Sequence, residues 1–361
     1  MFLSVTHRLR QSIAHLLWPR TSSEGLGPLV ERYLREQAPS RLGLGAGDLG
    51  RAESVAQGRN TLVRRLESEQ LGVLFVRAWR YDLRDRPARD HRQAGDLLAG
   101  AELTVPEILL RDDSWSALRR YRLELIIERA AQGRSLGSLR RDRGGRAEDD
   151  WWRAVARATA TLHARTGPAW GKPWRAENEM ADPRAYWLGR FEKLLARIPP
   201  HLIELDADRV RREIDRLARC LPDYASRSPA LVHGDLTPAH LFIDDSGRLT
   251  WIDFETVHFG HPAEDLATLR RWIDPGDPFD RFLEVYLESG STATGGLSGE
   301  IEYFERVRLL EKLSSRIVKR THRPERMSPP RAEQLSAEQR QAEQMLALKL
   351  DNSSPDGASA S

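Results

Sequence analysis

The residues with the clearest chemical potential in this sequence are two aspartates and a histidine around a short hairpin. The apolar runs HLFI and LTWI flank the turn sequence DDSG at residues 244–247. Apolar, β-branched and aromatic residues on both sides of such a turn predict a β-hairpin. A hairpin brings the start of its first strand to the end of its second, so we expect Asp235 and His240 to lie beside Asp253. Two carboxylates and an imidazole at one edge indicate a metal or proton-transfer site.

The same stretch resembles the catalytic and metal-binding segments of the protein-kinase-like phosphotransferases. His233-Gly234-Asp235, a ligand-type side chain five residues later, and Ile252-Asp253-Phe254 after the hairpin follow that pattern. The HGD form resembles the aminoglycoside and small-molecule phosphotransferase branch, as does Gly260-His261-Pro262 with Asp265 after it. His240 departs from the asparagine that is usual in this branch. A histidine at this place resembles the lipopolysaccharide core sugar kinases and some unassigned members of the small-molecule branch.

The resemblance implies a role for each matched residue. Asp235 would be the catalytic base that accepts the proton of an acceptor hydroxyl, and Asp253 would bind Mg²⁺. His240 stands where a second metal ligand is normal. Because imidazole is a poor ligand for Mg²⁺, His240 would either hydrogen-bond to phosphate or favour Mn²⁺. His233 and Asp265 would give structural support to the catalytic loop.

Two further segments are similar to nucleotide-binding parts of the family. The turn that contains Gly58 and Asn60 resembles the phosphate-covering loop, whose backbone N–H groups face the nucleotide phosphates. Ordinary turn chemistry explains the same residues. The apolar strand at residues 123–128 resembles the connection between the lobes, where the backbone from Glu128 to Ala130 would meet the adenine edge of ATP.

The third strand of the N-terminal part would carry the cation that binds the phosphates. The first lysine of the chain is Lys172, so the usual lysine is missing from this part. Arg77 is the expected substitute, with Arg80 as second choice, because a guanidinium can bind phosphate oxygens bidentately. The following helix lacks the glutamate that pairs with this cation in the family. Its only acids are Asp90 and Asp96, and the sequence does not choose between them.

Residues 170–187 are rich in tryptophan, proline and acids. In the family, this part of the chain contributes to the acceptor site. Aromatic faces and carboxylates would suit a sugar or a cationic aminoglycoside. An insertion that packs on the helical lobe explains the same residues equally well.

Composition restricts the class of protein. A chain of 361 residues with 40% hydrophobic content can form one two-lobed unit or two domains. The single cysteine, Cys220, excludes an internal disulfide and fits a reducing compartment. No apolar stretch is long enough to span a membrane. The net charge is only +3 with interspersed signs, which disfavours nucleic-acid binding. We therefore expect a cytoplasmic protein.

Residues 1–20 leave two interpretations open. Their apolar positions recur at helical spacing, with several arginines and no acid. Such a helix either packs on the folded body or lies on the anionic inner face of a membrane as a peripheral contact.

Together these features predict an α+β protein with a two-lobed protein-kinase-like fold. A helical extension at 1–45 would precede an N-terminal antiparallel sheet lobe at 46–128. A larger helical C-terminal lobe would span 129–325, followed by a polar helix and a tail at 326–361.

The expected activity is ATP-dependent phosphorylation of a hydroxyl on a small or sugar-containing molecule, with Mg²⁺ or Mn²⁺ as cofactor. A lipopolysaccharide core sugar kinase is an alternative that His240 favours. A regulatory pseudokinase that binds nucleotide is a second alternative. The missing lysine, the missing helix glutamate and the altered metal ligand at His240 favour the pseudokinase, whereas Asp235 and Asp253 favour an enzyme.

Overall fold

The chain folds into two compact units, one built on a sheet and one mainly on helices. Unit 1 comprises residues 1–100, 104–133 and 250–255, and unit 2 comprises the remainder. The computed structural model describes residues 26–45, 47–57, 61–80, 87–100, 103–144, 149–175, 180–221, 228–273, 279–290, 297–321 and 329–351. No helix within these ranges is both long and apolar enough to span a membrane.

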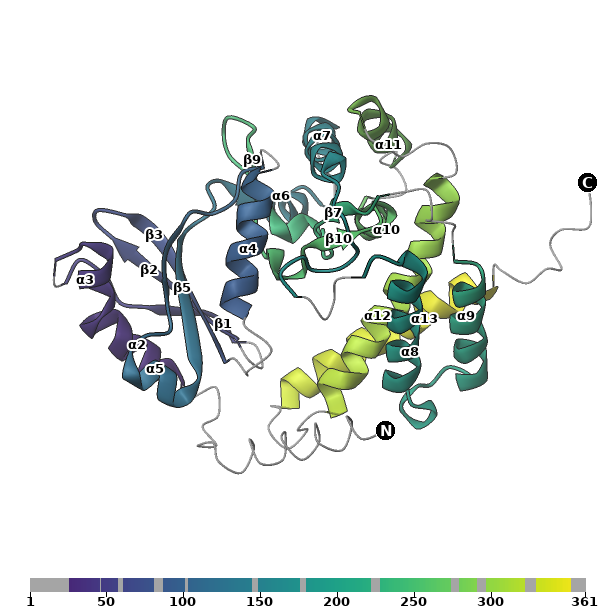
Figure 1. The fold of residues 1–361 in the computed structure, drawn as a ribbon, viewed down its shortest axis with the longest axis horizontal. Coiled ribbons are helices and arrows are strands. Elements are labelled where there is room, and N and C mark those ends of the chain that lie inside the picture. The colour runs from purple at the N-terminus through teal and green to yellow at the C-terminus, as the bar shows by residue number, and fades with distance from the viewer. Residues whose placement is uncertain are drawn as a thin grey trace, which may run out of the picture. The chain divides into compact units, whose positions relative to one another are not determined.

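Unit 1 contains a five-stranded antiparallel sheet with the strand order β1-β2-β3-β5-β4 (Figure 1). The strands are β1 (Glu53–Gln57), β2 (Thr61–Ser68), β3 (Gly72–Arg80), β4 (Ile108–Asp112) and β5 (Leu123–Arg129). Within the described ranges, four helices accompany them: α2 (Leu26–Glu36), α3 (Ala38–Leu42), α4 (Pro87–Gly100) and α5 (Ser116–Tyr121). The predicted antiparallel sheet lobe is confirmed.

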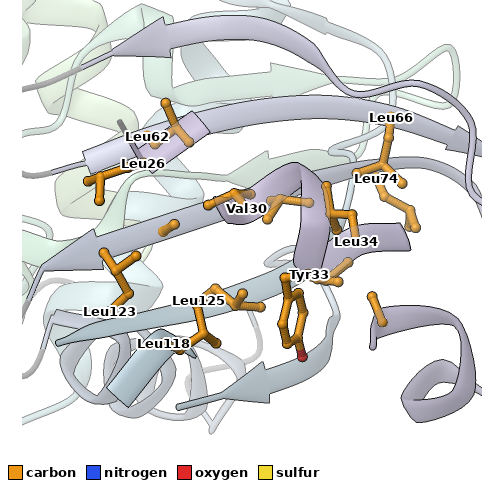
Figure 2. Packing of buried hydrophobic residues seen from close by; sticks show 14 residues of the cluster. Leu26, Val30, Tyr33, Leu34, Leu62, Leu66, Leu74, Leu118, Leu123 and Leu125 are labelled. Atoms are coloured by element: carbon orange, nitrogen blue, oxygen red, sulfur yellow. The ribbon is translucent and has the colours of Figure 1, made fainter. Parts of the chain in front are cut away.

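One face of this sheet packs against α2 and α5. Side chains alternate between the two faces of a strand, and Leu74, Val76 and Ala78 of β3 all belong to this buried core. Figure 2 shows Val30 and Tyr33 of α2 directed into it. The Tyr33 hydroxyl also donates to the buried carboxylate of Asp112 in β4, at 2.6 Å. The helices at 26–42, which the sequence analysis placed in a separate extension, thus share one core with the sheet.

The opposite face of the sheet carries α4. In the β3–β5 register Arg77 lies opposite Ile126, so their side chains point to the same face. Trp79, two residues along β3, packs with Ile126 and with Ala88 of α4. This arrangement places Arg77 beneath the first turns of α4.

Unit 2 contains eight helices within the described ranges and several very short strands. The helices are α6 (Leu136–Asp142), α7 (Asp149–Ala164), α8 (Pro183–Arg197), α9 (Ala207–Arg219), α10 (Ala263–Arg270), α11 (Phe279–Glu288), α12 (Leu297–Thr321) and α13 (Pro329–Asp351). The polar helix that the sequence predicts near the C-terminus corresponds to α13. Strand β7 (Ala230–Val232) pairs with β10 (His258–Gly260), and β6 (Arg134–Ser135) pairs with β8 (Leu241–Ile243).

The predicted hairpin is present as β8 and β9 (Leu249–Trp251). Its turn closes with the Asp244 N–H donating to the Arg248 carbonyl at 3.1 Å. The carboxylate of Asp244 accepts hydrogen bonds from the N–H groups of Ser246 and Arg248, both at 3.0 Å. The hydroxyl of Ser246 also donates to this carboxylate at 2.6 Å, and this bond together with the two backbone bonds lowers the pKa of Asp244. His240 does not begin β8 as expected. It ends a 3₁₀ turn, η4 (Pro238–His240), and the strand starts one residue later.

Candidate active site

The loop that carries Asp235 follows β7 and is held by the buried carboxylate of Asp265. Backbone N–H groups of His233 and Gly234 donate to its two oxygens at 2.7 and 2.8 Å. Gly234 has a φ of 81°, and a Cβ at this position would lie 2.7 Å from the carbonyl oxygen of Thr256. Only glycine fits both conditions. The loop is therefore rigidly built, while 53% of the Asp235 side chain remains accessible to solvent.

Asp265 stays ionised although it is fully buried. Burial alone would raise the pKa of Asp265, but the hydrogen bond and charge of His163 and the contribution of His233 lower it below its ordinary range. His163 Nε2 lies 3.3 Å from the carboxylate, and His163 Nδ1 lies 2.9 Å from the hydroxyl of Tyr286. An ionised carboxylate is the acceptor that the two backbone donors of the loop require.

The ring of His240 has one nitrogen engaged with the same loop. Its Nδ1 lies 2.8 Å from the carbonyl oxygen of Asp235. A carbonyl oxygen can only accept, so Nδ1 carries a proton. In the neutral imidazole the lone pair is then on Nε2. Histidines that bind metals commonly show this pattern, because a hydrogen bond from one nitrogen orients the other toward the ion.

Arg77 pairs with an acid from the neighbouring strand. Its Nε donates to Oε1 of Glu128 in β5 at 2.7 Å, and its Nη1 lies 3.6 Å from Oδ1 of Asp253. Burial acts to lower the pKa of Arg77, but the charges of Glu128 and Asp253 raise it above its usual value. The expectation that Asp90 or Asp96 of α4 would pair with Arg77 is therefore corrected: the acid comes from β5.

Both acids of β5 also hold helix α4. Glu124 Oε1 accepts a hydrogen bond from the backbone N–H of Ala88 at 2.8 Å, in the first turn of the helix. One turn further, His91 Nε2 lies 2.9 Å from Oε2 of Glu128. Burial would raise the pKa of Glu128, but His91 and Arg77 lower it. The Glu128 carboxylate thus connects the helix to the proposed phosphate-binding cation.

The backbone predicted to meet adenine is partly used within unit 1. The N–H of Arg129 donates to the carbonyl of Glu107, and the N–H of Ala130 donates to the carbonyl of Val73, both at 2.9 Å. An adenine contact at this point would therefore rely on carbonyl oxygens or on later residues. A nucleotide contact at Glu128 stays a prediction.

Asp253 has a strained backbone. Its φ is 60°, and within the described residues it shares a positive φ with only one other residue that is not glycine, Arg122. The left-handed conformation costs about 1–2 kcal/mol for an ordinary L-residue. Such strain persists only where the surrounding structure enforces it, and it is common at functional sites. The next residue, Phe254, is buried and stacks on the ring of His91, with 4.3 Å between centroids.

The predicted site residues are divided between the two units. Asp235 and His240 belong to unit 2, whereas Arg77 and Asp253 belong to unit 1. Each pair has a defined local geometry, and their convergence stays a prediction.

Several other predicted residues fall outside the described ranges. Gly58, Asn60 and residues 1–20 are among them, and so is the side chain of Arg80.

Two tryptophans of the predicted acceptor segment are interior residues. Trp170 and Trp187 are both buried. The guanidinium of Arg190 lies 4.1 Å from the ring centre of Trp187, and the ring of Tyr186 lies 6.1 Å from that of Trp170. For these two residues, the structure favours packing over direct contact with an acceptor.

Sequence reasoning missed a buried ion-pair cluster in unit 2. Glu264 of α10 lies 3.0 Å from Arg190 of α8 and 3.2 Å from Arg308 of α12, while both arginines also pair with Glu311. Burial opposes ionisation of Glu264, but Arg190, His258 and Arg308 lower its pKa well below the usual range. The signal in the sequence was an acid beside Asp265 in a helix that is otherwise rich in alanine and leucine.

Comparison with known proteins identifies the family. A model of the phosphotransferase enzyme family, APH, matches residues 51–300. This match covers well over half of the chain, and the chain therefore belongs to that family. The predicted phosphotransferase and its two-lobed kinase-like fold are confirmed.

Solved structures with low sequence identity share this fold. A thermostable mutant of aminoglycoside phosphotransferase APH(4)-Ia, in a ternary complex with AMP-PNP and hygromycin B, is 17% identical, with a TM-score of 0.61. The alignment covers 90% of this chain and 99% of that one. The GDP and kanamycin complex of APH(2")-IIia is 16% identical, with coverage of 91% and 99% and a TM-score of 0.59. Macrolide 2'-phosphotransferase MphH from Brachybacterium faecium is 20% identical, with coverage of 84% and 97% and a TM-score of 0.53. No match occurs among the curated proteins.

Proposed function

We propose that this phosphotransferase transfers the γ-phosphoryl group of ATP to a hydroxyl of a small or sugar-containing molecule. The observation that carries the proposal is the exposed carboxylate of Asp235 on a loop locked by Asp265. The named relatives support the acceptor class, because they act on or bind aminoglycosides and macrolides. The hydroxyl-bearing sugars of such molecules are acceptors of the proposed kind.

Phosphoryl transfer requires mainly positioning and stabilisation of negative charge. In our proposal Asp235 accepts the proton of the acceptor hydroxyl and orients its oxygen toward the γ-phosphorus. Arg77 binds the phosphate oxygens of the nucleotide, and its charge is secured by Glu128. The loop at Gly58 and Asn60 covers the phosphates.

A divalent cation fits the donors that the chain offers. Asp253 provides a carboxylate, and the hydrogen bond at Nδ1 of His240 leaves Nε2 as the ligand atom. We propose that these two residues hold Mg²⁺ or Mn²⁺. When bound, such an ion neutralises charge on the nucleotide phosphates.

A transfer assay tests the proposal. The full-length chain would be incubated with γ-labelled ATP or GTP and with panels of aminoglycosides, macrolides and lipopolysaccharide core sugars. We expect one panel to accept label from the wild type. Asp235→Asn should reduce turnover by about 10²- to 10⁴-fold with little change in nucleotide affinity, because loss of a positioned base has an effect of that size.

Two results would contradict the proposal. Full turnover by Asp235→Asn would remove Asp235 from the mechanism. Nucleotide binding without transfer to any acceptor, with no effect of residue 235, would favour the regulatory pseudokinase. The Arg77–Glu128 pair weakens that alternative, because the chain does provide a cation with an acidic partner.

A further inference from the structure

The carboxylate of Glu128 is shared by two donors from different elements. It is buried within β5, with 3% of the residue accessible. Arg77 of β3 donates to Oε1 at 2.7 Å, and His91 of α4 lies 2.9 Å from Oε2. A buried carboxylate needs a donor at each oxygen, because an unpaired charged oxygen in the interior is strongly unfavourable. The two contacts therefore depend on each other.

The contact fixes the protonation of the His91 ring. An ionised carboxylate can only accept, so His91 Nε2 must carry a proton. Nδ1 is buried and has no hydrogen-bond partner among the described residues. The contact with Glu128 thus requires a proton on Nε2 of His91.

Aromatic neighbours hold the His91 ring in its plane. Phe254 stacks on it at an angle of 25°, and the ring of Trp79 lies 5.6 Å away. Gly95, one turn along α4, makes room for Phe254, since a Cβ at this position would approach its ring to 3.3 Å. His91 is therefore in contact with both Glu128 and the residue that follows Asp253.

We propose that His91 is a positioning residue of the nucleotide site, which acts on Arg77 through Glu128. By saturating Oε2, the His91 N–H holds the carboxylate in the orientation in which Oε1 receives Arg77 Nε. Glu128 thereby accepts the hydrogen bond from Nε of the guanidinium, and the Nη groups donate to the phosphate oxygens. The inference rests on the proposed role of Arg77 in nucleotide binding. The sequence pattern led us to expect that one acid of α4 would support Arg77. In this proposal a histidine of α4 and an acid of β5 support Arg77 together.

Two substitutions that differ only in reach test this role. In His91→Gln the amide nitrogen is as far along the side chain as Nε2, so it can still donate to Glu128. In His91→Asn the amide nitrogen is one bond shorter and cannot reach. Both variants remove the aromatic ring equally. His201→Gln, at an exposed position of unit 2, controls for the loss of a histidine.

We expect His91→Asn to raise the dissociation constant of Mg·ATP about tenfold, the effect of one lost hydrogen bond to a charged group. His91→Gln should stay within about threefold of the wild type. The KM of the acceptor should change in neither variant, whereas a purely structural defect would affect both substrates. Equal nucleotide affinity of the Gln and Asn variants, whether strong or weak, would overturn the role of the Nε2 donor.

A second measurement does not depend on the variants folding. Nitrogen NMR of the histidine-labelled wild type should show His91 protonated at Nε2. A ring protonated only at Nδ1 would overturn the inference. Absence of Mg·ATP binding by the wild type would instead overturn the proposed function, and the positioning role with it. Normal wild-type binding with an unaffected Asn variant would overturn the positioning role alone.

Discussion

A single hydrogen bond decides what His240 can offer to a cation. With Nδ1 donating to the Asp235 carbonyl, the ring presents Nε2 as its only lone pair. Asparagine at the same position would present an amide oxygen. Nitrogen ligands favour Mn²⁺ over Mg²⁺ relative to oxygen ligands, since Mg²⁺ prefers an all-oxygen shell.

We therefore predict that His240→Asn shifts the metal preference toward Mg²⁺. The ratio of turnover in Mn²⁺ to turnover in Mg²⁺ should be several-fold lower in the variant than in the wild type. If His240 instead donates to phosphate, the ratio should stay constant while turnover falls in both metals. Identical ratios and identical rates would show that His240 takes no part in the site.

Arg77 is the second residue whose surroundings set its function. Its guanidinium neutralises the buried Glu128 and lies near Asp253, so its removal has a structural as well as a functional effect. Lysine would keep the charge but not the fork of donors that bridges carboxylate and phosphate.

We predict that Arg77→Ala weakens nucleotide binding far more than acceptor binding, with Arg77→Lys in between. Removing one partner of a buried ion pair costs about 3–5 kcal/mol, so a fall in thermal stability should accompany the alanine variant. Titration of both substrates against the three proteins measures the difference. Unchanged nucleotide affinity, with the loss appearing in Arg80→Ala, would transfer the role to Arg80.

At the scale of elements, the sequence predicted the helices and strands that depend on local residue patterns. The hairpin at β8 and β9, the third strand and helix α4 all follow from periodicity and turn residues. The partner of Arg77 could not be predicted in this way. It depends on the register between β3 and β5, which places Arg77 opposite Ile126, two residues before Glu128 on the same face of the strand. The two strands are distant in the sequence, and local sequence patterns do not predict the register between them.

The buried cluster in unit 2 joins three helices by charge. Arg190 of α8 contacts Glu264 of α10 and Glu311 of α12. The pKa values of both glutamates are lowered: burial opposes ionisation, and the arginines outweigh it. A group with a lowered folded-state pKa adds stability above its unfolded pKa, near 4.3 for glutamate, and this stability is lost as the pH falls through the folded value.

We predict that Arg190→Met lowers the free energy of unfolding at pH 7 by about 3–5 kcal/mol, because the buried Glu264 and the partly buried Glu311 lose one of the two cations that they share. The pKa values of the glutamates should rise in the variant, so its deficit should shrink as the pH is lowered toward 5. Urea unfolding at several pH values measures this. Arg209→Met, which removes an ion pair between α9 and Asp351 at the surface, should cost less than about 1 kcal/mol. A constant deficit across the pH range would contradict the explanation.

At the scale of the whole molecule, nucleotide binding and folding are linked. A ligand that binds only the folded chain raises the free energy of unfolding, by about 2.7 kcal/mol when it is present at 100 times its dissociation constant. The residues proposed to bind nucleotide come mainly from unit 1, whereas the proposed base lies in unit 2. Stabilisation by nucleotide should therefore respond to changes in unit 1 and not to the base.

We predict that Mg·AMP-PNP stabilises the wild type and Asp235→Asn equally and stabilises Arg77→Ala much less at the same concentration. The analogue prevents turnover during the measurement, and urea unfolding with and without it gives the difference for each protein. Asp235→Asn has lost the proposed base but keeps the Arg77–Glu128 pair, so its nucleotide linkage should be intact. The corresponding GTP analogue shows which purine is preferred. Equal stabilisation of Arg77→Ala and the wild type would place the phosphate-binding cation elsewhere in the chain, and loss of stabilisation in Asp235→Asn would mean that this carboxylate serves nucleotide binding rather than proton transfer.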